Sequence, residues 1–180
     1  MIATETVRSE AEVRAMLEEL DLEPIKVKLM DAEEGEGWTL EEADEAEIWY
    51  KRFLLLNFKY PDQSIIPTKI IDAFWHQHIL DTQKYAEDCE CVFGYFLHHF
   101  PYFGLRGEED AANLEKAFQL TLPLFEKEFG ASPVNATASE CDRSGGGGHC
   151  CRGCGSERST VASKVRPRRI RFTQFASGQC

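Results

Sequence analysis

Residues 69–93 read KIIDAFWHQHILDTQKYAEDCECVF, and this stretch decides the fold. Its core-type side chains recur at alternating spacings of four and three residues, as positions on one face of an α-helix do. The residues on this face are Ile71, Trp75, His78, Thr82, Tyr85, Cys89 and Val92. Thr68 can cap such a helix at its start, and Gly94 permits a break at its end. The pattern predicts a single helix over 69–93 with one buried face.

Three further stretches show helical periodicity. Residues 5–20 form a short amphipathic pattern, and 39–60 begins with Thr39 and Glu42 at capping-box spacing. The stretch from 107 to 130 begins with acidic residues, which the helix dipole favours there. The expected inward positions are Val13, Leu17 and Leu20, then Ile48, Phe53, Leu55, Leu56 and Tyr60, then Ala111, Leu114, Phe118 and Thr121.

Residues 25–29, IKVKL, instead alternate apolar and basic side chains. This alternation fits a strand, but it equally fits an extended segment laid across helices, because a lone strand has no partner. Periodicity stops after residue 130, and Gly145–Gly148 form a flexible run. The sequence therefore predicts an all-α fold: a single helical domain of four to five helices over 1–130, and a disordered, basic Gly/Cys-containing tail over 131–180.

The net charge of the chain also changes sign after residue 130. The 180 residues carry 31 Asp and Glu against 20 Lys and Arg, a net charge of −11. Residues 131–180 hold eight basic and three acidic residues, a net +5, which leaves −16 for 1–130. An acidic domain of this kind argues against nucleic-acid binding by 1–130, while the question stays open for the tail. The tail could also recruit protein partners.

The cysteines and the hydropathy bear on location. No run of about 18 apolar residues predicts a membrane span, and no basic segment followed by an apolar run predicts a secretory signal. We therefore expect a cytoplasmic protein whose seven cysteines are free thiols or metal ligands. Five of them follow residue 140, but Cys151 and Cys154 form one Cys-x-x-Cys pair without a second, so a zinc ribbon is not predicted.

Four of the five histidines lie between positions 76 and 99. On a helix, His76 and His78 point about 200° apart, so they cannot share one metal without a break. The helical neighbours are Asp72 with His76, at i and i+4, and His78 with Asp81, at i and i+3. Either carboxylate–imidazole pair could hold a metal or a proton-transfer site.

His98 and His99 fall in the turn after the long helix, and at least one of them could fold back to complete a site. The candidate ligands are Asp72, His76, His78, Asp81, His98 and His99. Such donors suit a divalent transition metal such as Zn, Fe, Ni or Cu, without choosing among them. Two alternatives stay open: a structural or protein-interaction module with a polar histidine-containing core, and a metal-dependent hydrolase or oxygenase.

The same segment resembles the glycine-rich domain-containing protein-like family. The resemblance rests on Asp72-x-x-Trp75-His76-x-His78, followed by Tyr85 and the Asp88-Cys89 pair, and it covers roughly residues 20–130. It implies a helical domain whose biochemistry is not established. It supplies no enzyme activity, and a shared fold alone warrants none.

Overall fold

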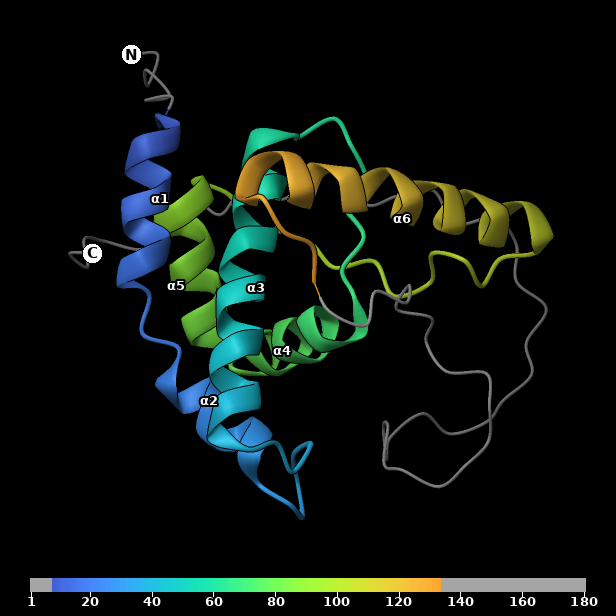
Figure 1. Cartoon of the computed structure of the whole chain (residues 1–180). Helices are drawn as coiled ribbons and strands as arrows, with labels where there is room; N and C mark the ends of the chain where they lie inside the picture. The colour runs from blue at the N-terminus through green and yellow to red at the C-terminus, as the bar shows by residue number, and fades with distance from the viewer. Residues whose placement is uncertain (1–7, 134–180) are drawn as a thin grey trace. The chain divides into compact units, whose positions relative to one another are not determined.

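A computed structural model describes residues 8–133 of the chain (Figure 1). The described residues form six α-helices and contain no strand. The helices are α1 (Glu10–Glu19), α2 (Glu23–Met30), α3 (Leu40–Lys59), α4 (Lys69–Leu80), α5 (Thr82–Phe93) and α6 (Glu108–Phe129). The all-α prediction is confirmed for this region, with one helix more than the four to five expected. Apart from its first three residues, the predicted tail over 131–180 lies outside the described residues.

Two helices begin with the capping chemistry that their sequences indicate. Thr39 accepts a hydrogen bond from the Glu42 backbone N–H, and the Glu42 carboxylate accepts one from the Thr39 N–H at 2.9 Å. Ser9 and Glu12 make the same reciprocal pair at the start of α1. Because each pair satisfies N–H groups that have no partner inside the helix, the starts of α1 and α3 are fixed locally.

The single helix predicted over 69–93 is wrong, because the chain breaks at Asp81. This residue has a ψ of 75°, and its carboxylate accepts a hydrogen bond from the Lys84 N–H at 3.4 Å as the cap of α5. The periodicity hides the break, since the inward positions of α4 and α5 stay in register across it; only Thr82 of that face is exposed. In Figure 1, α4 lies beside the lower part of α3, and α5 turns upward beside α1.

The strand or extended segment expected at 25–29 is also wrong, because these residues lie in α2. Ile25 and Leu29 are buried one helical turn apart, while Val27 is 67% exposed. Lys26 is buried too, with its ammonium 2.8 Å from Asp44 and 3.0 Å from Glu47. Apolar and basic residues alternate in this stretch, but buried and exposed residues do not. Lys26 is buried because its ammonium is paired, whereas the apolar Val27 is exposed.

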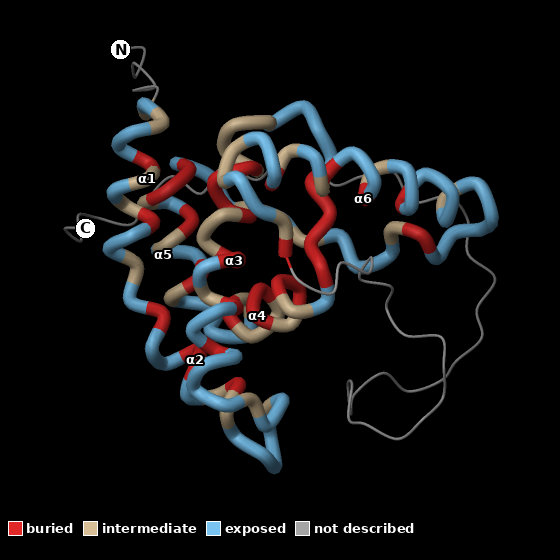
Figure 2. The backbone as a smooth tube through the Cα atoms, viewed as in Figure 1, coloured by how far each residue is buried: buried red, intermediate tan, exposed pale blue. Residues whose placement is uncertain are grey.

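The core surrounds α3, which contacts α1, α2, α4 and α6. Figure 2 shows the buried positions gathered around this helix. The largest fully buried side chains are Tyr50, Tyr85, Phe53, Phe74 and Phe125. Ile48, predicted to face inward, is 51% exposed, and the neighbouring Trp49 and Tyr50 are buried instead. Phe53, Leu55 and Leu56 are buried as predicted, so the predicted face of α3 differs from the observed one mainly at Ile48.

The last helix, α6, divides its inward face between two clusters. Leu114 and Phe118 pack with Ile66, whereas Phe125 joins the main core. Thr121 also binds α6 to the segment before α4, because its hydroxyl accepts a hydrogen bond from the Ile66 N–H at 3.1 Å. Ala111, predicted to be inward, is exposed. None of the described helices is long and apolar enough to cross a membrane.

Candidate metal centre

Helix α4 presents Asp72 and His76 on one face, one turn apart. Asp72 is 8% exposed, and its Oδ2 lies 3.5 Å from His76 Nδ1. His76 stands further out, with 44% of its side chain exposed. The i,i+4 spacing seen in the sequence therefore does place these two groups together, with the carboxylate on the buried side.

His99 comes to the same point from the segment that follows α5. Its Nε2 lies 3.4 Å from Asp72 Oδ1, and its ring centroid lies 4.6 Å from that of His76. One donor atom from each of Asp72, His76 and His99 lies within 4.8 Å of the others. Of the two histidines that could fold back in the sequence, His99 is the one that does.

The segment carrying His99 is fixed by hydrogen bonds to the helices. Gly94 ends α5 with a φ of 71°, a conformation that glycine adopts without strain, and this turns the chain back. The Tyr85 hydroxyl then donates to the Leu97 carbonyl at 2.6 Å, and it accepts from Trp75 Nε1 at 2.9 Å. Trp75 also packs edge-on against the His99 ring at 4.7 Å. His99 is therefore held by the anchored carbonyl of Leu97, two residues before it, and by the ring of Trp75.

The separations in this cluster are long for direct hydrogen bonds, and the two histidines approach different oxygens of Asp72. N–H···O hydrogen bonds in proteins span about 2.7–3.2 Å, so contacts of 3.4 and 3.5 Å are long. Donor atoms that share one metal lie a few ångströms apart, and one donor atom from each of these three residues lies within 4.8 Å of the others. Two imidazoles that flank one carboxylate at this spacing could bind a single metal ion.

His78 has a different environment, although it is only two residues from His76. It is 1% exposed, and its Nδ1 lies 2.9 Å from the Tyr50 hydroxyl. Its Nε2 lies 2.9 Å from Asp88 Oδ2, and Asp88 also pairs with Lys84 at 2.9 Å. Burial raises the pKa of Asp88, but the hydrogen bonds from His78 and Lys84 outweigh burial and lower it below the ordinary value. This arrangement is a buried hydrogen-bonded network.

The other two candidate ligands lie outside the cluster. Asp81, expected beside His78, caps α5 instead. His98 is exposed and contacts the ring of Phe96 at 4.9 Å. Sequence reasoning missed Asp88 as the partner of His78, because the two residues are ten positions apart and lie on different helices. The resemblance to the glycine-rich domain-containing protein-like family names Asp88, but it assigns no contact.

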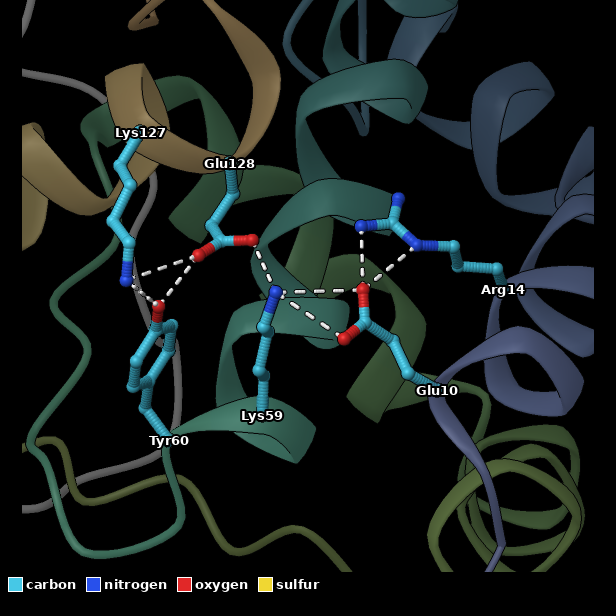
Figure 3. Close-up of polar contacts among 6 residues, drawn as sticks. All are labelled: Glu10, Arg14, Lys59, Tyr60, Lys127 and Glu128. Atoms are coloured by element: carbon cyan, nitrogen blue, oxygen red, sulfur yellow. Dashed lines mark hydrogen bonds and ion pairs between the residues drawn. The ribbon is translucent and has the colours of Figure 1, made fainter.

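A second polar cluster joins α1, the end of α3 and the end of α6 (Figure 3). Its members are Glu10, Arg14, Lys59, Tyr60, Lys127 and Glu128. The ammonium of Lys59 contacts both Glu128 and Glu10, and the Tyr60 hydroxyl donates to Glu128 at 2.6 Å. Lys59 and then Tyr60 lower the pKa of Glu128 to about 2. Because the charges in this cluster are paired with one another, it ties the helices together and offers no set of metal donors.

Fold and site together define an all-α arrangement over residues 8–133, with a histidine–carboxylate cluster at the junction of α4 and the segment after α5. The chain belongs to the UCP032817-like family, whose family model matches residues 14–124. No curated protein and no solved structure matches the chain significantly. The matched region contains Asp72, His76 and His99. The resemblance to the glycine-rich domain-containing protein-like family stays a prediction from the sequence motif.

Proposed function

We propose that this protein binds one divalent transition metal ion through Asp72, His76 and His99. A carboxylate oxygen and two imidazole nitrogens are donors that Zn, Fe, Ni and Cu accept. The observation that carries the proposal is the convergence of these three donors within 4.8 Å from two separate segments of the chain. The proposal narrows the six residues predicted from the sequence to three.

The contrast with His78 supports this choice. Both ring nitrogens of His78 lie 2.9 Å from a hydrogen-bonding partner, as expected for a histidine that stabilises the core. His76 and His99 face a shared carboxylate at longer distances, and they occupy less buried positions. One protein thus provides both a structural histidine and a pair suited to metal binding, separated by only two residues.

The experiment is metal analysis of the full-length chain purified without a polyhistidine tag, followed by titration with zinc. We expect one bound metal per chain. Asp72→Asn, His76→Ala and His99→Ala should each weaken zinc binding by about 100-fold or more, since loss of a direct ligand costs at least as much as loss of an outer-shell contact. His98→Ala is the matched control, because His98 is adjacent but exposed. Equal zinc affinity in the wild type and in His99→Ala contradicts the proposal.

The second candidate function is a structural or interaction module with a polar core, and the His78 network favours it. Under this alternative, His76→Ala and His99→Ala lower the melting temperature to the same extent with and without zinc. Under the metal proposal, the two variants differ from the wild type mainly when zinc is present. Thermal melts in zinc and in a chelator therefore separate the two functions.

A cytoplasmic location and protein partners for residues 131–180 are further proposals, and they rest on the sequence. The expectation that all seven cysteines are free thiols or metal ligands is wrong, because Cys91 is disulfide-bonded, so the location rests on the hydropathy pattern of the sequence alone. The partner proposal is supported by the basic charge of the tail, which is opposite to that of 1–130. Fractionation of cells and affinity capture with the full chain, compared with a chain whose tail arginines are replaced, test these two points.

A further inference from the structure

The protein donors of the candidate metal centre are not equally exposed. The side chains of Asp72 and His99 are 11% and 17% exposed, whereas that of His76 is 44% exposed. Two donors therefore approach from the protein interior, and the third stands at the rim. A metal held by these three atoms would face solvent on the side of His76.

The charge of the donor set has its own consequence. Two neutral imidazoles and one carboxylate bring a single negative charge to a divalent metal, which leaves a net charge of +1 at the centre. Structural zinc sites are closed by four protein ligands, whereas catalytic sites use three and keep a position for water or substrate. A positively charged centre that faces solvent favours an anionic oxygen ligand in that position.

We infer that the metal bound at Asp72, His76 and His99 takes up a small anionic oxygen ligand from solution, of the carboxylate or hydroxamate class. The inference rests on the proposed metal binding and adds that the site is of the open, catalytic type. It specifies the class of ligand that the site recognises: an anion with one or two oxygen donors, small enough to enter beside the exposed ring of His76.

Cobalt(II) provides the test, because its visible absorption reports the coordination of the metal. The full-length chain is loaded with cobalt and titrated with acetohydroxamate, with His98→Ala as the matched control. We expect the cobalt bands to shift and to saturate at one hydroxamate per cobalt, equally in both proteins. In His99→Ala, the protein-bound cobalt spectrum should be lost.

Three results would overturn the inference, and they are distinguishable from one another. If cobalt binds stoichiometrically but its spectrum ignores hydroxamate, the coordination sphere is closed, and metal binding alone stands. If the cobalt protein shows a thiolate-to-cobalt charge-transfer band, a cysteine occupies the position assigned to the anion. If the wild type binds no cobalt and no zinc, the proposed function fails together with the inference.

Discussion

His99 Nε2 lies 3.4 Å from Asp72 Oδ1, although 27 positions separate the two residues in the chain. The contact requires two changes of direction, one at Asp81 between α4 and α5 and one at Gly94 after α5. Between them, α5 carries the chain along α1, and the segment after Gly94 brings it back to Asp72 on α4. The helix break that the periodicity concealed is therefore what makes the candidate metal centre geometrically possible.

The first prediction concerns stabilisation by metal. A ligand that binds only the folded state at 100 times its dissociation constant stabilises it by about 2.7 kcal/mol. Zinc in such excess should raise the melting temperature of the wild type and of His98→Ala, but not that of His99→Ala. Differential scanning fluorimetry with and without a chelator measures this. An equal zinc-induced rise in all three proteins would place the metal elsewhere.

The second prediction concerns Tyr85 as a positioning residue. Tyr85→Phe removes the hydroxyl that accepts from Trp75 and donates to the Leu97 carbonyl, and so loosens the segment carrying His99. We expect zinc affinity to fall by about 10-fold, the lower end of the range for outer-shell contacts. Isothermal titration calorimetry provides the measurement.

Tyr102→Phe is the matched control for this variant, because Tyr102 is 61% exposed. It removes the same hydroxyl chemistry from the same region without touching the hydrogen bonds to α4 and α5. If Tyr85→Phe lowers the melting temperature but leaves zinc affinity at the wild-type value, Tyr85 has only a structural role.

How well the sequence predicts each contact of this site depends on how far apart the two residues lie along the chain. Asp72 and His76 meet because helix geometry alone brings i and i+4 together, so their pairing could be read from spacing. His99 and Asp88 reach their partners only through the break at Asp81, which no glycine or proline signals. The sequence indicated that His98 or His99 could fold back towards the helix, but it could not show which of these two adjacent residues does so.

The fold shows the same division. The capping box of α3 involves residues three apart, and its start was predicted from Thr39 and Glu42; the Ser9–Glu12 box of α1 has the same spacing, although the pattern over 5–20 did not mark it. The helix α2 could not be predicted in this way. The burial of its inward lysine depends on ion pairs with Asp44 and Glu47, which belong to another helix. Local spacing predicts local pairs, whereas buried charges are explained only by their tertiary partners.

The third prediction separates the structural histidine from the metal ligands. His78→Leu leaves the Tyr50 hydroxyl and the Asp88 carboxylate without their imidazole partner, and an unpaired buried polar group costs about 1–3 kcal/mol. We expect the free energy of unfolding to fall by about 2–3 kcal/mol in urea denaturation. The number of zinc ions bound by the folded variant should stay at one.

His98→Leu is the control for the change in residue type, and its stability should match that of the wild type. A His78→Leu protein that is as stable as the wild type would show that the buried network contributes little. A folded His78→Leu protein that binds no zinc would show that His78 belongs to the metal centre.

The fourth prediction concerns acid stability and Glu128. Lys59 and then Tyr60 lower the pKa of Glu128 to about 2, from an ordinary value of 4.5. The folded state therefore holds this carboxylate ionised more strongly than the unfolded chain does. Its contribution to stability is fully present above about pH 4.5 and is lost as the pH falls toward 2.

Glu128→Gln should lower the melting temperature at pH 7 by about 5 °C, and its stability should decline less between pH 5 and pH 2.5 than that of the wild type. Glu126→Gln, an exposed position on the same helix, serves as the control, and both values come from thermal melts followed by circular dichroism. Parallel acid profiles for wild type and Glu128→Gln would mean that the contacts of Glu128 with Lys59 and Tyr60 do not stabilise the packing of the end of α6 on α3, and that apolar contacts such as those of Phe125 hold it there.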